Sequence, residues 1–282
     1  MPELPEVETI KLGLQKYLVS HVIEDVIINN QKIFGGDKKD LIGSKIKDVR
    51  RFAKVLSIDL SNGNSIIIHV KLTGQLIYRG PNLRGSLNLS KKVVGGVPGK
   101  HTHVIFKLDR GGTLYYNDVR RFGWIKIIKT SDVETSEFIG KLGPEPFGKL
   151  NKSLFKEIIL KSKQPIKIVL MDQTKIGGIG NIYANDALWL SRIDPRKRSK
   201  ELSDQEIKNL YEAVLEVLKE GIKRGGASEL AFVTPDGSEG NYQKHFLAYG
   251  QEGKLCPRCK KAKFQKFFLG GRGTYWCPNC QK

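Results

Sequence analysis

Hydrophobic residues in the first ~130 positions come in short runs separated by turn-forming residues. Runs of this length, rich in Val, Ile and Phe and bounded by Gly, Asn and Asp, predict β-strands. The segments that fit are 22–29, 55–60, 65–70, 103–108 and 113–116. Residues 5–14 differ, because a proline in the first turn and apolar residues at helical spacing predict a helix. This strand-rich region indicates a β-sandwich or barrel.

The periodicity becomes helical after residues 142–147, where two prolines mark a connector. Residues 153–160 form a short amphipathic pattern, and Ser203-Asp-Gln-Glu206 has the form of a capping box that opens a longer helix. The pattern then ends in a Gly-, Pro- and Ser-rich stretch, 225–249, which indicates an ordered loop or a lid. A second long loop, 81–100, interrupts the strand region and is expected to be mobile.

These changes of pattern predict a multidomain α+β protein. The expected parts are an N-terminal β-sandwich domain (1–132), a linker (133–150), a helical domain (151–250) and a small C-terminal unit with all four cysteines (251–282).

The charge balance indicates a polyanionic partner. Lys and Arg number 48 against 29 Asp and Glu, which gives a net charge of +19, and no acidic residue occurs between Lys254 and Lys282. Nucleic acid is the favoured partner because phosphate neutralisation and counterion release reward many cations. An anionic membrane surface, or a basic surface without a specific ligand, remains an alternative.

Composition places the chain among soluble globular proteins, with 39% hydrophobic and 27% charged residues. The longest apolar run falls far short of the ~20 residues that span a bilayer. The first residues, MPELPEVE, are acidic and contain two prolines, unlike a secretory leader or a transit peptide. A cytoplasmic protein is therefore expected.

The four cysteines form two CxxC turns, Cys256-Pro-Arg-Cys259 and Cys277-Pro-Asn-Cys280, at the spacing of a zinc ribbon. Two disulfides are the alternative, which the absence of a leader disfavours. Four protein thiolates fill a tetrahedral site and leave no open position for water, so we expect one structural Zn²⁺ per chain. The intervening hairpin would present Arg272 at its Gly-rich tip.

Pro2 offers a nucleophile of a different kind. Removal of Met1 would expose a proline secondary amine with a pKa near 8, so a neutral fraction is available at physiological pH. Amines attack carbonyl-like carbons and form iminium intermediates. A proline at the second position is common, and by itself it is weak support for catalysis.

The string Met-Pro-Glu-Leu-Pro-Glu-Val-Glu at residues 1–8 resembles the start of the formamidopyrimidine-DNA glycosylase family, the bacterial repair enzymes for oxidised purines. Further motifs resemble the family in the same order along the chain. They are Arg50-Arg-Phe-Ala-Lys54, His69-Val-Lys-Leu-Thr-Gly74, Asp118-Val-Arg-Arg-Phe-Gly123, Leu142-Gly-Pro-Glu-Pro146, Gly178-Ile-Gly-Asn-Ile-Tyr183 and the zinc ribbon.

The resemblance implies an N-terminal β-sandwich with flanking helices, a helix-two-turn-helix domain and a zinc ribbon, with DNA in the cleft between. It also implies a proline amine that attacks C1′ of the damaged nucleotide and forms a Schiff base, a role that falls on Pro2. Glu3 matches the general acid for the sugar ring oxygen, and Glu6 a second carboxylate that assists proton transfer. Lys54 matches a lysine for phosphate binding and β-elimination, and Arg272 an arginine that supports δ-elimination.

Three side chains of the family fill the gap left by an extruded nucleotide. Arg120 and Phe122 match two of them, the arginine facing the orphaned cytosine and the phenylalanine wedging into the stack. Leu72 stands where the family usually has methionine, and Val119 replaces the usual proline. The remaining matches to DNA-contacting residues are His101, Lys163, Lys167 and Asn181. The loop 227–242 matches the family's lesion-capping loop.

The resemblance thus predicts a bifunctional DNA glycosylase and abasic-site lyase of base excision repair, which excises 8-oxoguanine and formamidopyrimidines and cleaves the strand by β,δ-elimination without a catalytic metal. Its expected partner is double-stranded DNA with oxidised bases or abasic sites, and the expected state is a nucleoid-associated monomer. Two alternatives stay open: an oxidised-pyrimidine glycosylase of the sister branch, and a catalytically silent damaged-DNA-binding protein.

Overall fold

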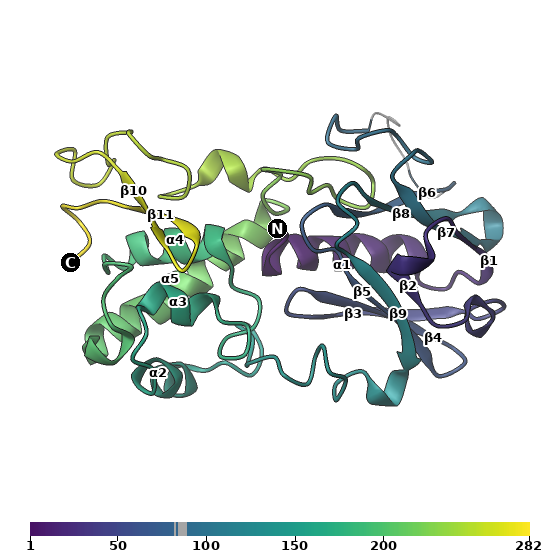
Figure 1. Cartoon of the computed structure of the whole chain (residues 1–282), viewed down its shortest axis with the longest axis horizontal. Helices are drawn as coiled ribbons and strands as arrows, with labels where there is room; N and C mark the ends of the chain where they lie inside the picture. The colour runs from purple at the N-terminus through teal and green to yellow at the C-terminus, as the bar shows by residue number, and fades with distance from the viewer. Residues whose placement is uncertain (82, 84–88) are drawn as a thin grey trace. The chain divides into compact units, whose positions relative to one another are not determined.

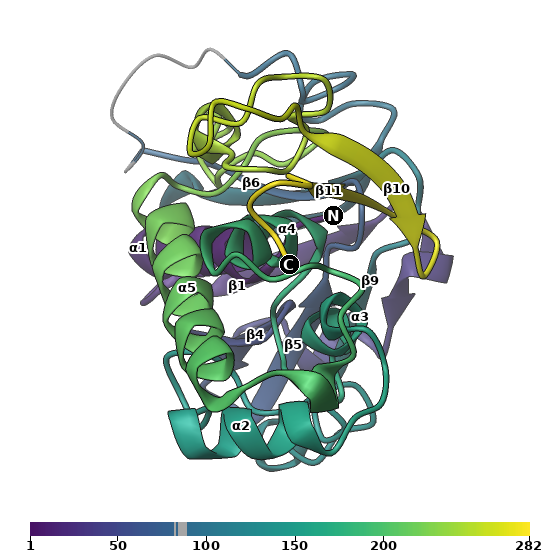
Figure 2. The same ribbon diagram turned by 90° about the vertical axis from the view of Figure 1, so that its left-hand side faces the viewer.

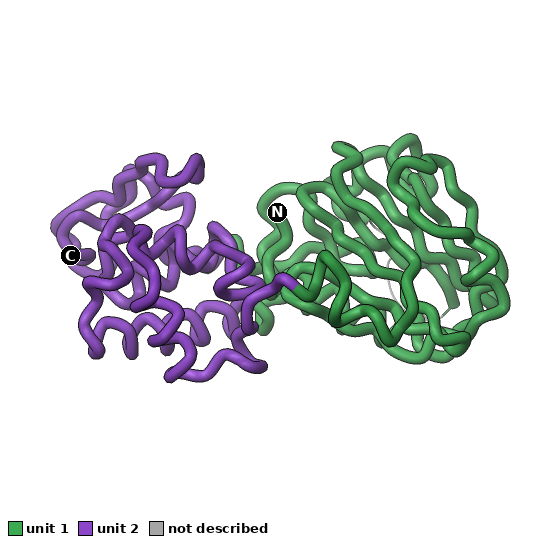
Figure 3. The backbone as a smooth tube through the Cα atoms, turned by 60° about the horizontal axis from the view of Figure 1, so that its bottom comes forward, with its two compact units in different colours: residues 1–140, 222–243 green, residues 141–221, 244–282 purple. Residues whose placement is uncertain are grey.

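A computed structural model describes residues 1–81, 83 and 89–282, which form two compact units (Figure 3). The first contains residues 1–140 and 222–243, and the second residues 141–221 and 244–282. The loop expected to be mobile, 81–100, falls partly on residues 82 and 84–88, which lie outside the described residues.

The first unit is a β-sandwich with a helix along it (Figure 1). One sheet has the strand order β1-β7-β8-β6 and the other β2-β9-β5-β4-β3, and all pairs are antiparallel except β2 with β9. The elements are α1 (Leu4–Leu18), β1 (Ile23–Ile28), β2 (Phe34–Gly35), β3 (Ile46–Phe52), β4 (Val55–Leu60), β5 (Asn64–His69), β6 (Gly74–Arg79), β7 (Thr102–Leu108), β8 (Thr113–Asp118) and β9 (Trp124–Lys129). The predicted β-sandwich is confirmed.

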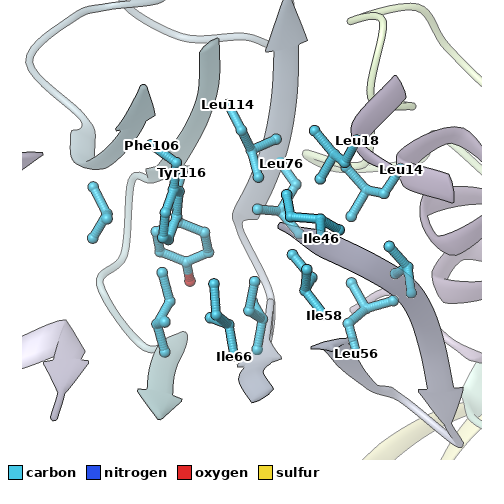
Figure 4. Close-up of a cluster of buried hydrophobic side chains, with 14 of the residues drawn as sticks. Leu14, Leu18, Ile46, Leu56, Ile58, Ile66, Leu76, Phe106, Leu114 and Tyr116 are labelled. Carbon is cyan, nitrogen blue, oxygen red and sulfur yellow. The ribbon is translucent and has the colours of Figure 1, made fainter. Parts of the chain in front are cut away.

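Side chains from both sheets and from α1 meet in one core (Figure 4). Leu14 and Leu18 of α1 lie there with Ile58 of β4, Leu76 of β6 and Phe106 of β7, all buried. Removing each such side chain from water stabilises the folded state by about 1.5–3 kcal/mol. The core therefore fixes α1 on the sandwich, and with it the N-terminal residues that carry the candidate chemistry.

The second unit contains four helices and a hairpin, which can be followed in Figure 2. Its elements are α2 (Lys152–Leu160), α3 (Ile166–Met171), α4 (Asn181–Leu190), most of α5 (Asp204–Lys223), β10 (Gln265–Leu269) and β11 (Arg272–Trp276). The predicted capping box is present, since Glu206 Oε2 accepts from Ser203 N at 2.8 Å and Ser203 Oγ from Glu206 N at 3.3 Å.

The compact units divide the chain differently from the pattern-based boundaries at 132, 150 and 250. Residues 222–243 belong to the first unit, because Phe232 is part of the sandwich core and Tyr78 N of β6 donates to Pro235 O at 2.7 Å. The cysteine-rich end groups with the helices, since Phe264 and two cysteines pack against Trp189 of α4.

Among the described residues, no helix is long and apolar enough to cross a membrane.

Candidate active site and nucleic-acid interface

The N-terminus of α1 brings three predicted catalytic residues together. Pro2 is buried, Glu3 is the residue that precedes the helix, and Glu6 lies in its first turn. Glu6 Oε2 accepts from Glu3 N at 2.7 Å, and the Glu3 side chain accepts from the backbone of Glu6. Both carboxylates are at most 4% exposed. This reciprocal cap holds two buried carboxylates directly beside Pro2.

Glu6 also binds the segment 227–242, which we call the capping segment. Its Oε1 accepts from Ala227 N at 2.7 Å. Gly226 makes this approach possible, because its φ is +78° and a Cβ there would lie 2.9 Å from Glu6 Cγ. One carboxylate therefore links the N-terminal helix to the start of the capping segment.

Lys54 lies in the turn between β3 and β4. Ala53, with a φ of +51°, forms this turn, and its carbonyl accepts from Arg51 Nη1 at 3.0 Å. Arg51 in turn binds Glu8 of α1, with its Nε 2.6 Å from Glu8 Oε2. The Lys54 side chain is 5% exposed. With this burial, Lys54 is not a solvated surface charge.

His69 stays uncharged beside these cations. Burial, together with the charges of Lys71 and Lys54, lowers the pKa of His69 to about 3. Its Nδ1 lies 3.0 Å from Lys71 N, a backbone donor, and a neutral ring supplies the acceptor. His69 therefore adds no positive charge to that of Lys54 and Lys71 at neutral pH.

Two adjacent turns carry the three predicted gap-filling side chains. Leu72 lies between β5 and β6, and Arg120 and Phe122 lie between β8 and β9. Arg120 and Phe122 are exposed, the latter by 55%, and the guanidinium carbon lies 4.7 Å from the phenyl centroid. Leu72 is partly exposed. A wedge and a base-reading group both need this accessibility.

Asp118 ties these turns together from a fully buried position. Its Oδ1 accepts from Thr73 Oγ1 and from Arg120 N, the latter at 3.2 Å, and its Oδ2 accepts from Gly123 N at 2.8 Å. Thr73 Oγ1 lies 3.0 Å from Arg120 N as well. Asp118 and Thr73 were not among the predicted site residues, although Asp118 opens one of the quoted motifs.

Gly123 allows the second turn to fold back so closely. A Cβ at this position would lie 1.9 Å from the Tyr116 hydroxyl and 2.8 Å from His69 O. The carbonyl of His101 accepts from Asp118 N at 3.0 Å, and His101 is partly exposed.

In the second unit, Lys167 and Asn181 meet at one carbonyl of the hairpin. Gly273 O accepts from Lys167 Nζ at 3.0 Å and from Asn181 Nδ2 at 3.1 Å. Lys167 also donates to Thr274 Oγ1 at 2.7 Å, and Lys167 is fully buried. In this structure the ammonium group of Lys167 binds the hairpin next to Arg272, and the contact of Lys167 with DNA stays a prediction.

Arg272 follows the hairpin tip and is exposed. Gly270 and Gly271 form the tip with φ values of +55° and +69°, the two left-handed residues that a tight hairpin turn requires. Asn185 Oδ1, in α4, accepts from Tyr275 N at 2.8 Å and anchors the same strand. Lys163 lies apart from this cluster, exposed between α2 and α3.

The four cysteines cluster as the spacing predicts. Their Sγ atoms all lie within 4.8 Å of one another, with Cys256 to Cys280 at 3.8 Å and Cys259 to Cys277 at 3.7 Å. A disulfide requires about 2.05 Å. Zn–S bonds of about 2.3 Å in a tetrahedron place sulfurs about 3.8 Å apart. The site therefore fits a tetrahedral metal ion and not a pair of disulfides.

Comparison with known families agrees with this arrangement. The profile of the formamidopyrimidine-DNA glycosylase N-terminal domain matches residues 1–125, and that of the formamidopyrimidine-DNA glycosylase H2TH domain matches residues 142–232. With the fold and the site geometry, these matches define the class: a DNA glycosylase of base excision repair.

Individual relatives match over their full length. The formamidopyrimidine-DNA glycosylase of Pelotomaculum thermopropionicum is 38% identical over 100% of this chain and 99% of its own, and that of Rickettsia africae is 38% identical with the same coverage. The Lactococcus lactis Fpg protein, solved with a THF-DNA and an inhibitor, has a TM-score of 0.86 and 34% identity, with 100% of both chains covered. The chain belongs to the formamidopyrimidine-DNA glycosylase family.

Proposed function

We propose that this glycosylase is bifunctional: it excises oxidised purines such as 8-oxoguanine and formamidopyrimidines, and then cleaves the strand at the abasic site. The observation that carries the proposal is the N-terminal cluster, in which Pro2 adjoins the buried carboxylates of Glu3 and Glu6. Two buried carboxylates next to a secondary amine supply a nucleophile and proton-transfer groups in one place.

In the proposed first step, the neutral amine of Pro2 attacks C1′ of the damaged nucleotide. The N–C1′ bond forms, the glycosidic bond breaks, and the base departs with the proton that the Pro2 nitrogen loses. Glu3 protonates the sugar ring oxygen as the ring opens, and the result is an iminium between Pro2 and C1′. Glu6, which holds Glu3 N, assists these proton transfers.

The strand is then cleaved by two eliminations. Loss of the C2′ proton expels the 3′ phosphate, and loss of the C4′ proton expels the 5′ phosphate. Lys54 supports the first by phosphate binding and proton transfer, and Arg272 the second. Water hydrolyses the remaining iminium and frees the Pro2 amine. The iminium is the electron sink for both eliminations, so these reaction steps need no metal ion.

The remaining site residues bind and distort the duplex. Arg120, Phe122 and Leu72 fill the gap left by the extruded nucleotide, supported by the turn contacts of Asp118. Contacts to phosphates come from His101, Lys163, Lys167 and Asn181, with Arg272 on the hairpin that Lys167 also binds. The Cys256, Cys259, Cys277 and Cys280 cluster would hold one structural Zn²⁺, which fixes that hairpin. The protein would act as a cytoplasmic, nucleoid-associated monomer.

Borohydride trapping on a duplex with 8-oxoguanine opposite cytosine tests this proposal. Reduction converts the iminium into a covalent protein–DNA adduct, and we expect the adduct to map to Pro2 by peptide mass. Parallel duplexes carry a formamidopyrimidine, an oxidised pyrimidine or a preformed abasic site. The oxidised pyrimidine is included because a Lactococcus lactis Fpg relative has been solved with such DNA.

Each outcome of the trapping decides between the alternatives. Adducts formed only with the oxidised pyrimidine would assign the chain to that substrate class. No adduct with any duplex, in protein that lacks Met1 and contains zinc, would favour a silent damaged-DNA-binding protein.

Replacement of Arg120 is expected to weaken discrimination of the opposite base. Its exposed guanidinium stands on a turn held by Asp118, so Arg120→Ala removes the base-reading group without removing the support. We expect the preference for cytosine over adenine opposite 8-oxoguanine to fall by about tenfold, the value of one good base contact. Single-turnover excision on the two duplexes measures this ratio, and Arg121→Ala is the control. An unchanged ratio would remove the reading role from Arg120.

A further inference from the structure

The capping segment, 227–242, has an exposed tip on a well-held base. Glu229 and Leu230 are exposed, Leu230 by 62%, whereas Ser228 is 1% exposed and Phe232 is 4% exposed. Ser228 Oγ donates to Phe232 O at 2.8 Å and accepts from Gly240 N at 2.9 Å. A large apolar side chain thus projects from a loop that is closed beneath it.

Two side chains from outside the capping segment hold the backbone on either side of this tip. Lys92 Nζ donates to Ser228 O at 2.5 Å, and Gln75 Nε2 donates to Ala231 O at 2.6 Å. Gln75 Nε2 also donates to Lys92 O at 2.9 Å, so the two anchors are joined to each other. Gln75 is 4% exposed and the Lys92 side chain is 24% exposed.

Residues 89–97 also contact the capping segment on the C-terminal side of its tip. Ser90 N donates to Gly237 O at 2.9 Å, and Ser90 Oγ donates to Glu239 Oε1 at 2.6 Å. A Cβ on Gly237 would lie 2.5 Å from Leu89 Cδ2, so the two backbones approach closely.

An apolar cluster and an ion pair complete the interface. Val93 packs with Ile77 of β6 and with Val233 of the capping segment, and all three are buried. Lys92 Nζ lies 3.2 Å from Glu239 Oε2, but the exposure of this pair limits its strength. The bond from Lys92 to the Ser228 carbonyl is therefore the specific polar contact that Lys92 adds near the tip.

We propose that residues 89–97 form a clamp that sets the shape of the capping segment, and that Lys92 is its specificity-determining positioning residue. This inference rests on the proposed function, in which the capping segment covers the extruded base. The clamp presents Glu229 and Leu230 in one arrangement before DNA arrives, so less ordering is required when the base is covered.

The proposal separates the two activities of the enzyme. Excision of 8-oxoguanine needs the base to be held under the tip, whereas an abasic site has no base to cover. Removal of the Lys92 hydrogen bond should slow base excision and leave strand cleavage at a preformed abasic site unchanged. A general defect in folding or in DNA binding would slow both.

The test compares Lys92→Met with the wild type in single-turnover assays on both substrates. We expect excision of 8-oxoguanine to fall by about tenfold, as for loss of one charge-assisted hydrogen bond, and abasic-site cleavage to stay within about twofold. Lys91→Met makes the same charge change at an exposed neighbour and should match the wild type in both. Lys92→Arg, which keeps a cationic donor, should restore much of the excision rate.

Hydrogen exchange on the DNA-free proteins tests the clamp independently. Amides of residues 227–240 should exchange faster in Lys92→Met than in the wild type or Lys91→Met, with α1 unchanged. Equal protection in all three proteins, or a parallel fall of excision and cleavage in Lys92→Met, would overturn the proposal. A wild type without activity on either substrate would refute the proposed function instead, and the exchange data would still decide whether the clamp exists.

Discussion

Insertion of an alanine between Met1 and Pro2 should abolish borohydride trapping and reduce base excision by a factor of about a thousand or more. The inserted residue turns the proline nitrogen into a tertiary amide, which has no lone pair available for attack on C1′. Glu3, Glu6 and Lys54 are unchanged, and the new terminal amine of the inserted alanine lies one residue away from the position of the Pro2 nitrogen. Quantitative trapping and single-turnover excision on 8-oxoguanine DNA measure the effect.

A second variant distinguishes the contribution of a terminal amine from that of the proline ring. Pro2→Gly keeps an N-terminal amine after Met1 removal but loses the secondary amine, so we expect residual trapping between those of the wild type and the insertion. Binding to DNA with an uncleavable abasic analogue, which needs no nucleophile, should change little in either variant. Full excision and trapping by the insertion variant would show that another residue forms the adduct.

The strand-rich half was predictable from sequence because its strands alternate or run apolar between turn residues. The predicted 55–60 strand coincides with β4, and the predicted 113–116 strand lies within β8. The edge strand β3 was missed because it reads Ile-Lys-Asp-Val-Arg-Arg-Phe, with too few apolar positions to stand out. β3 forms because it pairs with β4, although its own hydrophobic pattern does not indicate a strand.

The hydrophobic pattern does not indicate helix α4, for the opposite reason. Eight of its ten residues are buried, including Asn185 and Asp186, so it has no polar face to give a helical period.

For the candidate site, too, the sequence predicts some residues but not the contacts between them. The motif positions of Pro2, Glu6 and Arg120 were readable from the sequence, but the contacts that hold them were not. Lys167 matches a cleft lysine by its motif position, but the sequence does not show its hydrogen bonds to Gly273 and Thr274, which lie more than a hundred residues away. The proposed roles of Lys92 and Gln75 likewise depend on their hydrogen bonds to Ser228 and Ala231. Long-range partners of this kind leave no local signal.

Removal of the metal ion from the cysteine cluster should cost about a hundredfold or more in DNA affinity. A structural zinc site contributes about 10–16 kcal/mol of binding free energy to the fold that surrounds it. The hairpin at stake carries Arg272, and residues 254–282 include eight Lys or Arg and no acidic residue. Two charge-assisted hydrogen bonds to phosphate alone account for about two orders of magnitude in affinity.

A chelator series on the zinc-loaded protein, followed by binding to DNA with an abasic analogue, measures the effect. The logarithm of the affinity should also depend less steeply on salt, by about 0.9 for each phosphate that the protein no longer neutralises. Cys280→Ser should reproduce the weaker binding, and Asn279→Ser, an exposed neighbour in the same turn, should not. Zinc added back should restore binding to the chelated wild type. Unchanged affinity in protein shown by metal analysis to lack zinc would mean that neither the ion nor the hairpin is needed to hold DNA.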